Sequence, residues 1–167
     1  MDCLYFNGTI SILERKKCNY DLYSEEQKDL FSVSDDYYLV QCISADFAMG
    51  AGIAVQFNEH FNTRENLRRS HYNMLSEWDK SLAKGFCIQD GKVFNLVTKR
   101  NYYQKPTKKT ILNSLVDLRK QVLKQRIRLL AMPKIGSGLD KMNWNLIRNL
   151  IKYTFNDINV KIVVCYM

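Results

Sequence analysis

The amino-acid sequence predicts an α/β fold in which helices cover both faces of a largely parallel or mixed β-sheet. Along the later two-thirds of the chain, short apolar runs of strand length alternate with longer segments whose apolar residues have helical spacing. Glycine-containing loops follow two of the apolar runs, which is where open α/β sheets bind ligands. A chain of 167 residues is long enough for one domain with a real core, so we expect residues 1–167 to form a single domain.

Six segments are predicted to be strands because each is a short apolar or alternating run bounded by turn residues. They are residues 4–13, 37–44, 86–88, 93–98, 128–132 and 160–165. The pair Asp90-Gly91 between the third and fourth segments is typical of a β-hairpin. The polar residues 16–36 are predicted to run over the surface.

Four segments carry apolar residues at helical spacing, so each is predicted to bury one helix face. Thr107 and Asn143 are suitable N-caps for the last two of them. The expected inward positions are Ile53, Phe57 and Phe61 in residues 52–61; Leu67, Met74, Leu75 and Trp78 in residues 64–78; Ile111, Leu115, Leu118 and Val122 in residues 107–125; and Ile147, Leu150, Ile151 and Phe155 after Asn143.

Charge and cysteine usage narrow the class of protein. The formal net charge of +8 favours an anionic partner, whether nucleic acid, a phosphorylated ligand or an acidic surface. No apolar run approaches the roughly 20 residues that span a bilayer, so we expect no membrane association. The start of the sequence does not resemble a signal peptide and no Cys-x-x-Cys pair occurs. We therefore expect an intracellular protein, cytoplasmic or nuclear, with reduced thiols and no metal site.

The first unusual loop, residues 44–54, joins a predicted strand to a predicted helix. Its Gly50-Ala51-Gly52 turn lets the backbone come close to a ligand, and the amides of the next helix favour an anion such as phosphate. An ordinary strand-to-helix turn would look the same. The loop is not a P-loop, because no Gly-Lys-Ser/Thr follows.

Two further positions follow predicted strands. The loop 133–140 contains Gly136-Ser137-Gly138 and then Asp140, so it offers a second backbone cradle for a diphosphate. Asp140 is equally suited to a plain turn or a helix cap. Lys99 ends an apolar strand and is either a solvated charge or, if it faces a ligand crevice, a nucleophile.

Taken together, these loops resemble those of the macrodomain family. The family's first ligand loop is similar to VQCISAD (40–46) followed by MGAGIA (49–54). One branch, the terminal ADP-ribose protein glycohydrolases, resembles this chain at LVTK (96–99), KPT (105–107) and MPKIGSGLD (132–140). The resemblance covers roughly three-quarters of the chain, from about Tyr38 onward.

The resemblance implies a mixed central β-sheet sandwiched between α-helices, with ADP-ribose as the ligand. It places Lys99 on the branch's catalytic lysine and Asp140 on its catalytic aspartate. The residues that it implies for ADP-ribose binding are Thr9, Ile10, Ser44, Met49, Gly50, Ala51, Gly52, Ile53, Pro133, Ile135, Gly136, Ser137, Gly138, Leu139, Cys165 and Tyr166.

The adenine end departs from the family pattern. Many macrodomains have an aspartate after the first strand that reads the adenine amine, whereas Thr9 stands at the matching position here. The related branch has an adenine-stacking tyrosine near the C-terminus, and the direct match is Cys165 with Tyr166 one residue later.

The expected activity is hydrolysis of ADP-ribose from acyl linkages to glutamate or aspartate, with O-acetyl-ADP-ribose as a further substrate. It would need no cofactor, and the protein would act as a monomer on ADP-ribosylated proteins. Four alternatives stay open: a non-catalytic ADP-ribose reader, an ADP-ribose-1″-phosphate phosphatase, an O-acetyl-ADP-ribose deacylase, and a hydrolase of ADP-ribosylated DNA. Lys99 and Asp140 argue against the reader, which needs neither residue.

Overall fold

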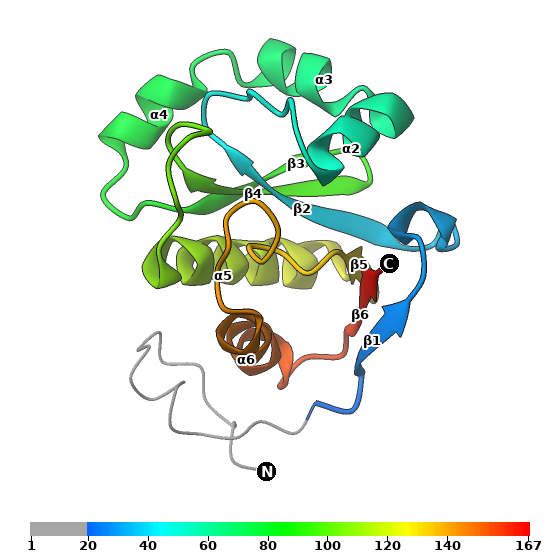
Figure 1. The fold of residues 1–167 in the computed structure, drawn as a ribbon. Helices are drawn as coiled ribbons and strands as arrows, with labels where there is room; N and C mark the ends of the chain where they lie inside the picture. The colour runs from blue at the N-terminus through cyan, green and yellow to red at the C-terminus, as the bar shows by residue number, and fades with distance from the viewer. Residues whose placement is uncertain (1–19) are drawn as a thin grey trace. The chain divides into compact units, whose positions relative to one another are not determined.

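The strands form one mixed sheet in the order β1-β6-β5-β2-β4-β3 (Figure 1). The computed structural model describes residues 20–167. β1 pairs in parallel with β6, β6 with β5 and β5 with β2, whereas β3 and β4 are antiparallel. The strands are β1 (Tyr23–Gln27), β2 (Tyr38–Ser44), β3 (Phe86–Asp90), β4 (Val93–Lys99), β5 (Leu129–Met132) and β6 (Lys161–Tyr166).

Helices flank this sheet, which confirms the predicted α/β fold (Figure 1). They are the 3-10 helix η1 (Leu30–Ser32) and the α-helices α2 (Ile53–Phe61), α3 (Thr63–Ser70), α4 (Met74–Lys80), α5 (Lys108–Gln125) and α6 (Trp144–Phe155). In the part of the chain that the structure describes, no helix has both the length and the hydrophobicity needed to cross a membrane.

Residues 20–40 and 119–167 make up one compact unit, which contains the parallel strands β1, β5 and β6 and the helix α6. The predicted inward face of α6 is buried, with Ile147 and Ile151 fully shielded from solvent. Asn143 caps α6 as predicted, because its Oδ1 accepts hydrogen bonds from the amides of Asn145 (2.9 Å) and Leu146 (3.4 Å).

Residues 41–118 make up the second compact unit, which contains the β3–β4 hairpin, the end of β2 and the helices α2 to α4. The predicted hairpin forms: Asp90 pairs with Val93, and Gly91 and Lys92 make the turn between them. α5 also begins as predicted, since the Oγ1 of Thr107 accepts a hydrogen bond from the amide of Thr110 (3.1 Å). A hydrophobic cluster fills this unit; its buried members are Ile43, Ala45, Phe47, Met49, Leu67, Met74, Trp78 and Val97.

One predicted helix is two in the structure. Residues 64–78 form α3 and α4, separated by residues 71–73. The Ser70 hydroxyl donates to the Asn66 carbonyl (3.0 Å) and pairs with a His71 ring nitrogen (2.8 Å), so polar side chains compete with the helix at this point. Leu75 and Phe61, both predicted to face inward, are instead more than a third exposed.

The predicted surface segment 16–36 is also corrected. Its described part contains η1 and the strand β1, which pairs with β6 at the edge of the sheet. The sequence of β1, YSEEQ, lacks the apolar run from which strands were predicted. An edge strand can consist of such polar residues, because part of it stays exposed to solvent. The predicted strand at 4–13 lies outside the described residues.

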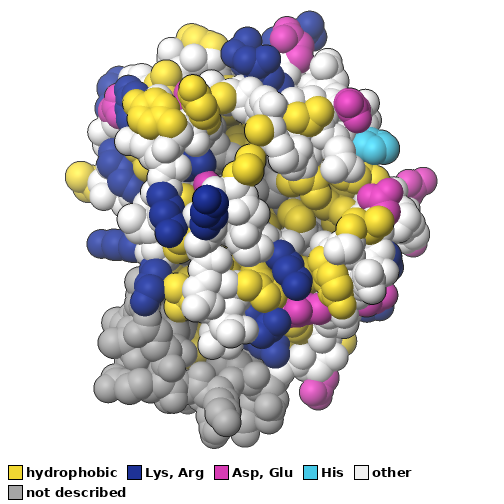
Figure 2. Space-filling model, in the orientation of Figure 1, with side chains coloured by type: hydrophobic (Ala, Val, Ile, Leu, Met, Phe, Trp, Pro, Cys, Tyr) yellow, Lys and Arg dark blue, Asp and Glu magenta, His cyan; other side chains and the backbone are white. Residues whose placement is uncertain are grey.

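Hydrophobic side chains also reach the surface of the second unit. Figure 2 shows them among white and dark-blue side chains in the upper part of the view, where Figure 1 draws α4. The large exposed side chains of α4 and its flanks are Tyr72, Leu75 and Leu82. Single exposed hydrophobic residues are normal on protein surfaces, so they imply no function by themselves.

Glu25 joins β1 to α6 within the first unit. Its carboxylate accepts hydrogen bonds from Arg148 on both oxygens, from the Tyr23 hydroxyl (2.6 Å) and from the Trp144 indole (3.5 Å). The Arg148 hydrogen bonds are the main reason why the pKa of Glu25 falls to about 2.

Glu25→Gln is expected to destabilise the fold near pH 7 by about 1–2 kcal/mol, less than the full pKa shift implies because the pair stays in part open to solvent. A carboxylate with a lowered pKa stabilises the native state above its unfolded pKa and loses that effect as the pH falls. The difference between wild type and variant, measured by urea denaturation, should therefore shrink from pH 5 toward pH 2. A difference that stays constant over that range would contradict this account.

Candidate functional site

The loop between β2 and α2 has an unusual backbone conformation. Phe47 (φ 53°) and Met49 (φ 44°) both adopt the left-handed backbone conformation, which residues other than glycine rarely adopt. Both side chains are buried in the hydrophobic cluster of the second unit. The Phe47 carbonyl accepts from Arg64 Nε (2.9 Å), and the Met49 carbonyl accepts from Asn58 Nδ2 (3.1 Å). Packing and hydrogen bonds therefore hold a strained loop in one shape, as is common at ligand sites.

The two glycines of this loop have different roles. Gly52 (φ 64°, ψ −151°) lies in a region that essentially only glycine adopts, and it begins α2 without a side-chain cap. Gly50 has no such constraint: a Cβ there would lie 3.7 Å from the nearest atom, the Ala48 carbonyl oxygen, which is ordinary contact. Gly50 and Ala51 are exposed. The fold therefore does not require glycine at position 50, whereas close approach of a ligand would.

Lys99 is the last residue of β4, and it is half-buried. Its Nζ donates a hydrogen bond to the carbonyl oxygen of Tyr102 (2.9 Å) across the turn that follows. Asn101 and Gln104 close this turn, because the Asn101 amide donates to Gln104 Oε1 (2.8 Å) and the Gln104 amide donates to the Asn101 carbonyl (3.1 Å).

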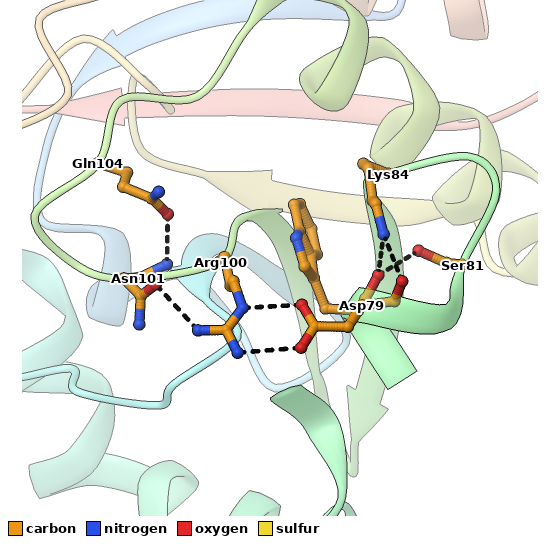
Figure 3. Close-up of polar contacts among 7 residues, drawn as sticks. Asp79, Ser81, Lys84, Arg100, Asn101 and Gln104 are labelled. Carbon is orange, nitrogen blue, oxygen red and sulfur yellow. Dashed lines mark hydrogen bonds and ion pairs between the residues drawn. The ribbon is translucent and has the colours of Figure 1, made fainter. Parts of the chain in front are cut away.

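Arg100 fastens the same turn to α4. Its Nε and Nη2 donate to the two carboxylate oxygens of Asp79, at 2.8 and 3.0 Å (Figure 3). The Arg100 guanidinium lowers the pKa of the Asp79 carboxyl. Both groups are well exposed, so this pair sets the geometry of the turn more than it stabilises the fold.

Asp46 connects the β2–α2 loop with the turn after β4. Its Oδ1 accepts from the Ser44 hydroxyl (2.5 Å) and the Ala48 amide (3.1 Å), and its Oδ2 accepts from the Tyr102 amide (3.0 Å). Burial alone would raise the pKa of Asp46, but these hydrogen bonds and one from Asn101 outweigh it and lower the pKa. The sequence alone indicates no role for Asp46, because an aspartate two residues after a strand end is usually a turn residue.

The loop 133–140 lies in the first unit. Gly136 (φ 72°) is buried and its carbonyl accepts from the Met142 amide (2.7 Å), whereas Gly138 and Leu139 are exposed. The Ser137 hydroxyl donates to the Lys134 carbonyl (2.6 Å). A Cβ at Gly138 would meet nothing within 4 Å, so there too glycine is not required by the fold.

The C-terminal end of β6 belongs to the same unit. Cys165 is buried, and Tyr166 on the other side of the strand is 36% exposed. The Nζ of Lys134 lies 4.3 Å from the centroid of the Tyr166 ring, in a cation–π contact. An aromatic ring is thus available next to the loop 133–140, one residue after the position that matches the family pattern.

The structure groups the predicted site residues by unit. The second unit holds Lys99 together with Ser44, Met49, Gly50, Ala51, Gly52 and Ile53. The first unit holds Asp140, which is half-buried, together with Pro133, Ile135, Gly136, Ser137, Gly138, Leu139, Cys165 and Tyr166. Thr9 and Ile10 lie outside the described residues. Among residues 20–167, no group of three or more His, Cys, Asp or Glu side chains is placed to hold a metal ion.

No family model matches the chain. Two mammalian proteins, ADP-ribose glycohydrolase OARD1 of Bos taurus and of Homo sapiens, are each 34% identical to it over 137 residues, covering 81% of this chain and 86% of the relative. The chain belongs to the macrodomains of the terminal ADP-ribose glycohydrolase type.

Solved macrodomain structures agree with this assignment. The macrodomain of Thermus aquaticus DarG has a TM-score of 0.70 at 20% identity, covering 87% of this macrodomain and 97% of that chain. Thermosipho africanus DarTG in complex with ADP-ribose has a TM-score of 0.67 at 17% identity, covering 89% of this macrodomain and 43% of that chain. At these identities the structures show the fold, and the macrodomain predicted from the sequence is thereby confirmed.

Proposed function

We propose that this macrodomain binds ADP-ribose and hydrolyses it from acyl linkages to glutamate or aspartate on proteins. The observation that carries the proposal is the 34% identity to relatives named ADP-ribose glycohydrolase, over 86% of their length. In addition, Lys99 and Asp140 both stand in the motifs that mark the branch. O-Acetyl-ADP-ribose also carries an acyl ester on its distal ribose, so we propose it as a further substrate; attack at C1″ would release its acyl group only from that carbon.

The diphosphate is proposed to bind to backbone amides. The exposed Gly50-Ala51-Gly52 turn presents backbone that a side chain would otherwise shield. The uncapped first turn of α2 adds partial positive charge for an anion. The complex of Thermosipho africanus DarTG with ADP-ribose supports this ligand for the fold.

Lys99 is the proposed nucleophile. Its deprotonated amine attacks C1″ of the distal ribose, so that a C–N bond forms and the bond from C1″ to the acyl oxygen breaks, releasing the glutamate carboxylate. Opening of the ribose ring gives a protonated Schiff base on Lys99, and water hydrolyses it to free ADP-ribose and the amine. The hydrogen bond to the Tyr102 carbonyl holds the amine in one place before the attack.

Asp140 is the proposed general acid and base. Ring opening needs a proton on the ring oxygen, and attack by water needs a group that accepts one, so one carboxyl can serve both steps in turn. In a non-catalytic reader, neither Lys99 nor Asp140 would act on a covalent bond. Substitutions at the two positions therefore distinguish the enzyme from the reader.

Binding is tested first, with a variant that the fold tolerates. Gly50→Ala should raise the Kd for ADP-ribose by about tenfold, or about 1.4 kcal/mol, because the added methyl group keeps the diphosphate away from the backbone. The melting temperature without ligand should change by no more than about 1 °C. Calorimetric titration with ADP-ribose measures the affinity. No heat and no thermal shift with wild-type protein would exclude the proposed ligand.

Turnover is tested with a protein that carries ADP-ribose on glutamate. Lys99→Ala and Asp140→Ala should each lower kcat by roughly 10³-fold, and the double variant should lose little more, because both residues act on the same covalent route and the loss of either one already blocks it. Lys99→Arg should fail equally, since its guanidinium keeps its proton. Both alanine variants should still bind ADP-ribose. Near wild-type turnover by both alanine variants would contradict the proposed chemistry.

A further inference from the structure

A chain of hydrogen bonds in the second unit connects Asp46 to the Lys99 amine through a single residue. The amide of Tyr102 donates to Asp46 Oδ2 (3.0 Å), and the carbonyl oxygen of Tyr102 accepts from Lys99 Nζ (2.9 Å). Tyr102 itself contributes only backbone atoms, and its side chain is 63% exposed. The carboxylate therefore fixes the residue on which the lysine amine rests.

Asp46 is itself held from the other side. Its Oδ1 accepts from the Ser44 hydroxyl (2.5 Å) and the Ala48 amide (3.1 Å), so the carboxylate cannot rotate without losing bonds. Its own amide donates to the Arg100 carbonyl (3.1 Å), next to Lys99 in the chain. Hydrogen bonds to a charged acceptor are stronger than those between neutral groups, so this connection is stiff.

We propose that Asp46 is a positioning residue that sets the location of the Lys99 amine by holding the turn after β4. The inference rests on the function proposed for Lys99, and Asp46 does not need to touch the substrate. Misplacement of a reacting group by about 1 Å can cost about 100-fold in rate. A hydrogen bond to a fixed carbonyl oxygen would keep the amine in place and so avoid this reduction in rate.

Asparagine at position 46 distinguishes the positioning role from a role in packing alone. Its side chain has nearly the shape of aspartate but only one acceptor oxygen. It can therefore serve the Ser44 and Ala48 donors or the Tyr102 amide, but not both. The connection to Lys99 is broken or weakened while the volume of the side chain is kept.

The first readout is independent of catalysis. Trace acetylation with an N-hydroxysuccinimide ester, followed by mass spectrometry, reports how accessible each amine is, with the exposed Lys80 as an internal reference. In Asp46→Asn the labelling of Lys99 relative to Lys80 should rise by about two- to tenfold, the factor that corresponds to one lost hydrogen bond. Asp90→Asn is the matched control: Asp90 also accepts a side-chain hydrogen bond, from Asn66 (3.0 Å), and its loss should leave the ratio unchanged.

The second readout is the split between kcat and KM on the glutamate-linked substrate. Asp46→Asn should lower kcat by roughly 10- to 100-fold and leave KM within about threefold, since the proposed diphosphate contacts are backbone amides of other residues. An unchanged Lys99 labelling ratio, or a raised ratio with wild-type kcat, would overturn the positioning role. Failure of the proposed function is a separate result, because it appears as inactivity of the wild-type protein.

Ser44→Ala is a second test of the same connection, for use if Asp46→Asn does not fold. It removes one donor from Asp46 Oδ1 and leaves the bond from the Tyr102 amide to Oδ2, so the carboxylate is less restrained. The Lys99 labelling ratio should rise in the same direction but by less than in Asp46→Asn. A ratio equal to that of wild type in this variant would likewise overturn the proposal.

Discussion

The candidate site of the second unit depends on the way in which the ends of β2 and β4 are joined. Beyond the strands, the Ala45 amide donates to the Lys99 carbonyl (2.9 Å) and the Asp46 amide donates to the Arg100 carbonyl (3.1 Å). These bonds continue the backbone pairing into two loops that would otherwise be independent. The Asp46 carboxylate then extends the connection to Tyr102. A glycine-rich loop and a lysine far apart in the sequence thus become one rigid element.

This rigidity has a cost in backbone strain. Phe47 and Met49 adopt left-handed conformations that their side chains disfavour, and the hydrophobic cluster around them offsets that strain by burying both side chains. The loop that leads to the exposed Gly50-Ala51-Gly52 turn is held by these contacts and by its hydrogen bonds to Asn58 and Arg64. A turn that is already ordered loses less conformational entropy on binding than a mobile one, which would favour the ADP-ribose binding that we propose for it.

The sequence was informative where one local signal determined the structure. Helical spacing located α5 and α6, Thr107 and Asn143 cap them, and Asp90-Gly91 marked the β3–β4 hairpin. Prediction from the sequence failed where a segment's structure depends on residues far away in the chain. β1 is polar and is a strand only because β6 pairs with it.

The same limit applies to the candidate site. The motifs pointed to Lys99 and to the glycines, which carry recognisable signals of their own. The role that we propose for Asp46 was not evident from the sequence, because its partner Tyr102 lies 56 positions away and contributes only its backbone amide to this bond. The left-handed φ angles of Phe47 and Met49 could not be predicted either, since both residue types normally avoid them.

The central claim is that Lys99 forms a covalent bond with the ribose during hydrolysis. Turnover of the glutamate-linked substrate in the presence of cyanoborohydride would reduce the Schiff base to a stable amine, and peptide mass spectrometry would locate it. The account predicts an ADP-ribose adduct on Lys99 that is missing from Lys99→Ala. Continued hydrolysis with no adduct, or with an adduct on a different lysine, would contradict it.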